Sequence, residues 1–286
     1  QDGDERHGLL VRIGVRVPGE PDRDHPRYGG QIQDDAIAGV EPELRVAIDW
    51  LPHGGKFGDG EPFELVAPRY RLEQPADGPL GADVVLGGRV APQLIGLGLL
   101  EAIPAAALEA LADPDDRDGD GISGRVHRLG EAPDAPIGRC GWKATQPTVH
   151  AQTAGAFVHD MGITSPDQPV EPMPAAQLER VHAQNAAPTT PPASTSVEPE
   201  IDAAKLGRVV FYTRTLAVPA QRDADDPEVR RGHALFRSFG CAACHTETFV
   251  TGPVAFPDHF GGPTIHPFTD LLLPDLGQAP ADGQRD

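Results

Sequence analysis

The sequence predicts a mainly α-helical protein with an antiparallel β-rich insertion in its N-terminal part. Helical patterns recur from residue 91 onward, whereas the stretch from about residue 8 to residue 74 is rich in β-branched residues in partial alternation. The 33 glycines and 31 prolines among the 286 residues indicate many turns and argue against long uninterrupted elements. Hydrophobic residues make up 39% of the chain and aromatic residues 5%, so a large apolar cofactor would help to fill its core.

The β-rich insertion is predicted from three short segments. GLLVRIGVRVPG, LRVAIDWLP and FELVAPRYRL each contain β-branched or aromatic residues in partial alternation. Clusters of Gly, Pro and Asp bound all three segments and predict turns between them. We therefore expect strands over about residues 8–74.

Helices are predicted on both sides of an acidic loop. The segment APQLIGLGLLEAIPAAALEAL has helical character, accommodates Pro104 in a first turn and stops at Asp113, because a residue before proline disfavours the α conformation. A second helix is expected after Pro147. It should end at Gly162, since glycine is the usual residue just past a helix C-terminus.

A proline-rich segment divides the chain. Residues 165–200 contain eight prolines, and the stretch PTTPPASTS within them has too little apolar content to pack. Apolar periodicity returns at Ile201. The sequence therefore predicts a first domain over residues 1–164, a linker over 165–200 and a second domain over 201–286.

The charge and hydropathy exclude two classes of partner. The formal net charge of −19 disfavours binding to nucleic acid, whose phosphates would be repelled. This negative charge would attract a basic protein partner electrostatically, or it serves only to keep the protein soluble. No run approaches the ~18 apolar residues of a membrane span. The chain begins at Gln1 without a signal peptide, and we expect a mature form or a fragment.

The motif CAACH is the clearest chemical signal. In a C-x-x-C-H motif the two thiols form thioethers with the two vinyl groups of haem, and the following imidazole binds the iron. Cys241 and Cys244 would attach a c-type haem, with His245 as the proximal ligand. A redox dithiol would require a thioredoxin-like context, and a zinc site a second ligand pair; the sequence has neither.

The residues before the motif support haem. Asp226 is expected to cap a helix with Pro227 at its first position, and Gly232 and Phe236 then share one face. This arrangement resembles the first helix of cytochrome c domains. For the sixth ligand, a Met or His, the chain offers Met161 and Met173 upstream and His266 downstream. A lone His before Pro is also typical of a structural or surface residue.

A second group of residues lies in GWKATQPTVHAQTAGAFVHDM. Trp142, Gln152, Asp160 and Met161 form this set, and Gln152 and Asp160 share one stripe of the predicted helix. An amide and a carboxylate on one stripe could face a ligand. Alternatively, they form a solvated polar face.

Several motifs together resemble the bacterial di-haem cytochrome c peroxidases, the related di-haem enzyme of methylamine utilisation and, more closely, the di-haem oxidoreductases classed as peroxidases or thiol oxidoreductases. They are GLGLLEAIP, DGDGISGR, GRCGWKATQP, GAFVHDMGITS, LAVPA, GCAACHTETFVTG and TIHPFTDLLL, in that order. The resemblance implies two cytochrome c-like domains, the first of them peroxidatic. It implies that Trp142 lies between two haems, that Gln152 orients hydrogen peroxide and that Asp160 shuttles its proton. It further implies a small redox protein as electron donor and a periplasmic location.

The chain departs from that family in three respects. The first CxxCH is absent, so we expect a fragment whose second haem is attached upstream of Gln1 and whose C-terminal end is truncated. Asp160 stands where the peroxidases usually have Glu. Leu276 and Cys140 replace an expected Met and Phe, which removes one possible axial ligand at position 276. Cys140 is interpreted as a small core residue rather than a reactive thiol.

The acidic loop DRDGDGI resembles the first half of an EF-hand calcium loop. Asp116, Asp118 and Asp120 occupy positions 1, 3 and 5, and the carbonyl of Ile122 occupies position 7. Position 12 is His127 instead of Glu, so the loop is incomplete. It is interpreted as a calcium site or as a solvated acidic turn.

Three functions remain open from the sequence. The first is a di-haem peroxidase; the alternative is a mono-haem cytochrome that only transfers electrons, which the lone CxxCH favours. A third is a calcium-stabilised binding module without enzymatic activity.

Overall fold

A computed structural model describes residues 8–18, 22–36, 40–175, 177–180, 198–253 and 258–276. These residues form two compact units. The first combines the described residues up to Val90 with those of 172–180, and the second combines Ala91–Glu171 with the described residues from 198 onward. Half of the predicted linker lies outside the described residues, namely residues 176 and 181–197. Among the described helices, none is both long and apolar enough to cross a bilayer.

The first unit is built on an antiparallel sheet. Its strand order is β2-β1-β5, with β1 at Leu9–Val15, β2 at Arg23–Asp24 and β5 at Val84–Val90. Strand β1 pairs with β5 along its whole length, from Leu9 opposite Val90 to Val15 opposite Val84. The core of this unit consists of buried side chains from β1 and from the segments that cross it: Val11, Ile13, Tyr28, Ile32, Leu44 and Val46.

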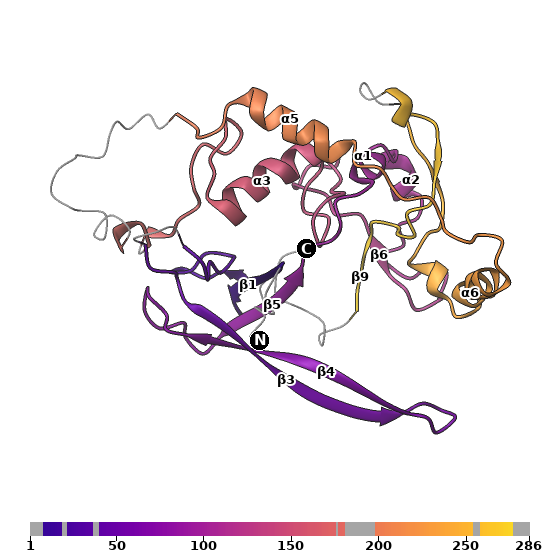
Figure 1. Cartoon of the computed structure of the whole chain (residues 1–286), viewed down its shortest axis with the longest axis horizontal. Helices are drawn as coiled ribbons and strands as arrows, with labels where there is room; N and C mark the ends of the chain where they lie inside the picture. Colours follow the sequence, from indigo (N-terminus) through magenta and orange to yellow (C-terminus); the bar gives the residue numbers. More distant parts are fainter. Residues whose placement is uncertain are drawn as a thin grey trace. The chain divides into compact units, whose positions relative to one another are not determined.

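A long hairpin extends from this core. Strands β3 (Arg45–Lys56) and β4 (Pro62–Glu73) contain 12 residues each and pair in register from Arg45 opposite Glu73 to Lys56 opposite Pro62. Figure 1 shows them as a two-stranded ribbon ending in a turn. Near its base, Tyr70 and Leu72 pack against the core of the unit. The part beyond Trp50 is almost entirely exposed.

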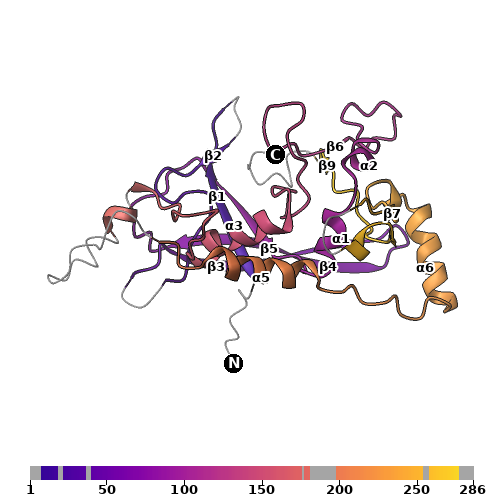
Figure 2. The same cartoon turned by 90° about the horizontal axis from the view of Figure 1, so that it is seen from above.

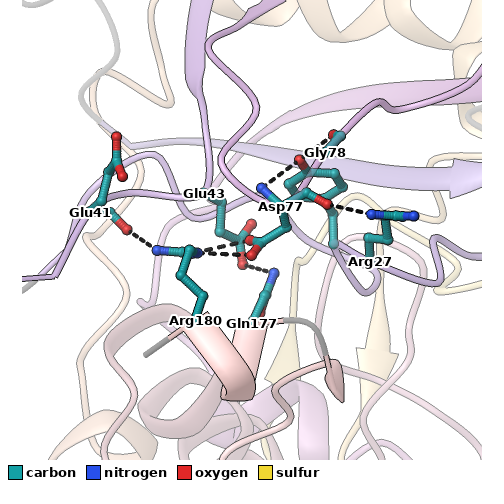
Figure 3. A network of polar contacts seen from close by, with 8 residues as sticks. Arg27, Glu41, Glu43, Asp77, Gly78, Gln177 and Arg180 are labelled. Atoms are coloured by element: carbon teal, nitrogen blue, oxygen red, sulfur yellow. Dashed lines mark hydrogen bonds and ion pairs between the residues drawn. The ribbon is translucent and has the colours of Figure 1, made fainter. Parts of the chain in front are cut away.

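Buried polar side chains tie residues 177–180 to the rest of the first unit (Figure 3). The amide nitrogen of Gln177 donates to Glu43 Oε1 at 2.6 Å, and the backbone N–H of Gln33 donates to Glu43 Oε2 at 3.0 Å. The guanidinium of Arg180 donates to both carboxylate oxygens of Asp77, at 2.8 and 3.1 Å. Burial raises the pKa of Glu43 to about 7, although both of its hydrogen bonds oppose the shift. Near neutral pH, Glu43 therefore holds its proton more readily than an exposed carboxyl does.

The second unit contains the longer helices. They are α3 (Val149–Met161), α5 (Ala203–Arg214) and α6 (Pro227–Ser238), and two short helices, α1 (Leu97–Glu101) and α2 (Ala105–Glu109), precede them. Helices α3 and α5 pack side by side, as both Figure 1 and Figure 2 show. Their contact buries Ala154 of α3 against Leu206 and Val210 of α5.

Short strands and turns connect these helices. Strand β6 (Gly124–Arg125) pairs with β9 (Leu273–Pro274), and β7 (Phe249–Val250) pairs with β8 (Thr264–Ile265). Two 3₁₀ turns complete the unit, η1 at Cys241–Ala243 and η2 at Asp258–Phe260. A second core cluster packs residues from the early and late parts of this unit's sequence together. It consists of Ile103, Leu108, Ile137 and Phe249.

The prediction of a mainly α-helical fold is wrong. Strand residues are about as numerous as helical ones in the described part of the chain, because β3 and β4 are twice the typical strand length of ~5–6 residues. The helical segment predicted from residue 91 forms only α1 and α2, of five residues each. Pro104 separates them, with the extended backbone angles φ −60° and ψ 139° at the start of α2.

Candidate functional site

The CxxCH motif follows α6 directly. Asp226 caps this helix by accepting a hydrogen bond from the backbone N–H of Glu228, and Pro227 occupies its first turn. The left-handed backbone of Gly240, with φ 80°, separates α6 from the 3₁₀ turn η1 that begins at Cys241. Cys241 is exposed and Cys244 is partly exposed, and both thiols are free. Both cysteines are thus accessible to a ligand at the surface of the protein.

His245 is held in one tautomer. Its Nδ1 lies 2.9 Å from the carbonyl oxygen of Phe268. A carbonyl oxygen only accepts hydrogen bonds, so Nδ1 carries the proton and donates it. The lone pair is then on Nε2, which is available to a metal ion. An imidazole that binds a metal through one nitrogen and donates from the other to a backbone carbonyl is the usual arrangement in metalloproteins.

An aromatic pair lies beside His245. The ring of Phe236 lies 6.2 Å from that of His245 and contacts Phe268 edge-on at 5.5 Å, both measured between ring centroids. Phe236 is the aromatic residue that the sequence placed on one face of α6. No residue of α6 is buried, and Phe239 is 76% exposed. A helix with apolar side chains and no buried residue, next to two free thiols and a tautomer-fixed imidazole, fits a large apolar prosthetic group such as haem.

An ion-pair cluster holds α6 against the segment after the motif. Glu247 accepts two hydrogen bonds from Arg237, at 2.6 and 2.8 Å, and a third contact from His233 Nε2 at 2.8 Å. The hydrogen bonds from Arg237 and His233 lower the pKa of Glu247 to about 2. Arg237 and His233 are four residues apart on α6, so they share a face. The sequence analysis did not identify this cluster, although the spacing of a cation and a histidine on the helix was visible.

Gln152 and Asp160 both lie on α3 but in different surroundings. Thr148 caps this helix by accepting from the backbone N–H of Ala151, and Gly162 ends it with φ 67°, as predicted. The Oε1 atom of Gln152 is buried and has no hydrogen-bond partner among the described residues. Asp160 and Met161 are exposed at the last turn. Eight residues of α-helix separate Gln152 from Asp160, which places their backbones about 12 Å apart along the axis.

Trp142 lines a pocket of about 280 Å³ in the second unit. Its side chain is 57% exposed. The same pocket is lined by Thr269, Leu271, Leu272 and Leu273, which follow Phe268, the residue whose carbonyl oxygen contacts His245 Nδ1. The structure therefore brings the predicted Trp142 close to the segment that orients the predicted haem ligand.

Sequence reasoning missed Arg139, which also lines this pocket. Its guanidinium donates to the carbonyl oxygens of Ile137 and Ile103, while its Nε is buried and meets no acceptor among the residues that the structure describes. Burial lowers the pKa of Arg139. Its neighbour Cys140 is 2% exposed, and burial raises the pKa of this thiol to about 11. A neutral buried thiol is unreactive, which agrees with the interpretation of Cys140 as a core residue.

The two positions considered for the sixth ligand in the C-terminal part are both exposed. The Nδ1 of His266 lies 3.2 Å from the hydroxyl of Thr248. Leu276, which stands in place of an expected Met, is 70% exposed. The sixth ligand, whether His266 or Met161, stays a prediction.

The three aspartates of the acidic loop converge. One carboxylate oxygen each from Asp116, Asp118 and Asp120 lies within 4.8 Å of the others. Backbone N–H groups also donate to them: Gly121 to Asp116 at 3.1 Å, and Ile122 to Asp120 at 2.8 Å. The loop is therefore folded as a concave group of oxygen atoms, which suits a hard cation. These hydrogen bonds equally stabilise the carboxylates of a solvated acidic turn.

One comparison with known proteins gives a match. The family model described as "Di-haem oxidoreductase, putative peroxidase" matches residues 74–286. The matched part contains CxxCH, Trp142, α3 and the acidic loop, whereas β1 to β4 precede it. No curated protein and no solved structure matches the chain.

Proposed function

The chain belongs to the di-haem oxidoreductase family, and we propose that it is a peroxidase that reduces hydrogen peroxide with electrons from a small redox protein. Membership confirms the family that the sequence motifs indicated. The observation that carries the proposal is the hydrogen bond from His245 Nδ1 to the carbonyl of Phe268, which leaves Nε2 to bind iron next to two free thiols.

The residues around CxxCH would hold one haem. Cys241 and Cys244 would form the thioethers, and His245 would be the proximal ligand. When bound, haem supplies an iron that exchanges single electrons. A second haem, which the family description implies, would need an attachment motif outside these 286 residues.

Three side chains would serve the reaction. Reduction of hydrogen peroxide to two water molecules consumes two electrons and two protons. The carboxamide of Gln152 would orient the peroxide, and the carboxylate of Asp160 would take a proton from one peroxide oxygen and return it to the other. Since their backbones are about 12 Å apart along α3, a water molecule would have to link them. Trp142 would provide an aromatic path for electrons between the haems.

The acidic charge supports a basic electron donor. A net charge of −19 steers a positively charged protein toward the chain at low ionic strength. We propose the periplasm or another exported location. This proposal rests on the expected c-type haem attachment and on the resemblance to the family. The electron donor and the location are thus both inferred from the family resemblance.

Counting covalent haem tests the proposal first. The parent gene, with whatever precedes Gln1, would be expressed in a host that matures c-type cytochromes, and haem per chain measured by pyridine haemochrome absorbance. We expect two haems, of which one disappears in a variant with Cys241→Ser and Cys244→Ser. One haem in the parent would overturn the di-haem peroxidase. It would establish the alternative that the lone CxxCH favours, a mono-haem cytochrome for electron transfer alone.

We also propose that the acidic loop binds calcium. The convergence of Asp116, Asp118 and Asp120 supports this site, and the carbonyl of Ile122 would be a fourth ligand. The loop lies near the haem motif, since Asp120 is one of the charges that raise the pKa of Cys244, after burial and Asp270. A bound cation would neutralise part of this negative charge beside the attachment site.

Removing one loop carboxylate tests the calcium site. Asp118→Ala should abolish the calcium-dependent increase of the melting temperature, measured with added calcium and with a chelator. Asp115→Ala is the matched control, because Asp115 is an exposed neighbour that pairs with Arg117 and is outside the group of three. A parent protein whose melting temperature is the same with calcium and with chelator would rule out the site.

A further inference from the structure

The outer half of the β3–β4 hairpin exposes apolar side chains on both of its faces. From Trp50 to Arg69 every residue is exposed except Gly55 and Phe63. Opposite residues share a face, so the register defines two faces. The Trp50/Val66 face consists of Trp50, Pro52, Val66 and Pro68, and the Leu51/Leu65 face consists of Leu51, His53, Leu65 and Ala67. The hairpin precedes residue 74, where the match to the family begins.

The two faces differ in their relation to the rest of the first unit. Val46 and Tyr70 belong to the side of the hairpin that continues as the Trp50/Val66 face, and both pack in the core of the unit. The Leu51/Leu65 face is on the other side. At its base Asp49 accepts hydrogen bonds from Arg69 and Arg71, at 2.8 and 3.0 Å. The Leu51/Leu65 face therefore turns away from the core and is open to a partner.

Prolines make the edges of the hairpin poor templates for another strand. Pro52 pairs with Val66 and Pro68 pairs with Trp50, two positions apart in the ladder. A proline has no N–H and is accepted in a strand where its nitrogen points to the open edge. Pro52 thus removes an outward-pointing backbone N–H from the edge of β3, and Pro68 removes one from the edge of β4. Both losses disfavour the pairing of another strand with these edges. A partner would bind a side-chain face instead.

The charge of the hairpin fits a second copy of the same chain. From Arg45 to Glu73 it carries four basic and five acidic side chains, a net charge of −1, whereas the whole chain has −19. The hairpin is thus close to neutral, so repulsion between two acidic chains is modest here. The charge is also polarised. The tip, residues 56–64, has one Lys and three acidic residues, while the base has Arg45, Arg69 and Arg71 against Asp49 and Glu73.

We propose that this face is a homodimer interface, in which the Leu51/Leu65 faces of two hairpins pack antiparallel about a two-fold axis. Such an axis places the acidic tip of one hairpin opposite the basic base of the other, and it buries Leu51 and Leu65, which are 41% and 60% exposed in the single chain. A two-stranded hairpin is marginally stable alone, and a second pair of strands gives it a core of its own. The three carboxylates at the tip disfavour insertion into lipid.

Two adjacent residues provide the test. Leu65→Lys places a charge on the Leu51/Leu65 face, and Val66→Lys places the same charge on the other face at a similar exposure, 57%. Sedimentation velocity over a concentration series of the full chain would measure the dimer dissociation constant. We expect Leu65→Lys to raise it by about thirtyfold or more, as for a central interface residue, and Val66→Lys to leave it nearly unchanged.

Three results would overturn the proposal. They are a parent protein that stays monomeric at every concentration, dissociation by Val66→Lys with no effect of Leu65→Lys, and a monomer that binds neutral phosphatidylcholine vesicles through Leu65. A second variant tests the charge pattern: Glu61→Lys makes the tip less acidic and should also weaken the dimer, because it then faces Arg69 and Arg71 of the second copy. Unaltered association of Glu61→Lys would exclude the antiparallel arrangement.

Discussion

Replacing Gln152 or Asp160 with alanine is expected to lower peroxide turnover of the matured protein by about 10²–10⁴-fold, the usual contribution of a positioned proton-transfer group. Asp160→Ala removes the carboxylate that would move the proton between the peroxide oxygens. Gln152→Ala removes the amide that would orient the peroxide, and it also deletes a buried Oε1 that has no hydrogen-bond partner in the described part of the chain. Initial rates with hydrogen peroxide and a reduced electron donor would measure both effects.

The controls separate chemistry from folding. Haem content must stay at the parent value in each variant, since neither residue belongs to the CxxCH motif. Asp167→Ala removes a different exposed carboxylate near α3, one that contacts His150 at 2.7 Å, and should leave turnover unchanged. Asp160→Glu should retain most of the activity, because the peroxidases that the chain resembles usually have Glu at this position. Parent-like turnover in both alanine variants would contradict the assigned roles.

The haem motif could be predicted from sequence because its chemistry is local. Cys241, Cys244 and His245 lie within five residues, and the caps of α6 precede them directly. The residue that fixes the imidazole proton of His245 on Nδ1 is Phe268, 23 residues later in sequence. Its contribution is a backbone carbonyl, which every residue possesses. No pattern of side chains could have indicated it.

The fold class could not be predicted equally well. Alternation correctly predicted strands between residues 8 and 74, but not that β3 and β4 reach 12 residues each and extend beyond the support of the core. Strand β5 was missed because VVLGGRV contains two glycines, which weaken a strand pattern, yet its pairing with β1 compensates for them. The helical segment from residue 91 was overestimated, because apolar periodicity does not reveal where α1 ends before Pro104.

A partly buried ion pair of the second unit was equally invisible in the sequence. Glu101, at the end of α1, accepts two hydrogen bonds from Arg214 at the end of α5, at 2.7 and 3.0 Å. The residues are 113 positions apart. The same carboxylate accepts the backbone N–H of Val149, the first residue of α3, at 3.3 Å. One side chain thus joins α1, α5 and the first residue of α3, the helix that carries Gln152.

Glu101→Ala is therefore expected to lower the free energy of unfolding of the second unit by about 3 kcal/mol, because it leaves the partly buried Arg214 without its counter-ion. The side chains of Arg214 and Glu101 are only 24% and 18% exposed, so solvent screens the lost interaction weakly. Native-state hydrogen exchange of the α3 and α5 amides would measure the change.

Glu109→Ala is the matched control for this loss. Glu109 also pairs with an arginine, Arg128, but their side chains are 43% and 33% exposed. A surface pair of this kind contributes about 0–1 kcal/mol, so its removal should change the exchange of α3 and α5 little. An equal effect of both variants would show that charge alone, and not the burial of Glu101, stabilises the helices. If Glu101→Ala alone loosens α3, the position of Gln152 depends on a contact made by two residues far from it in sequence.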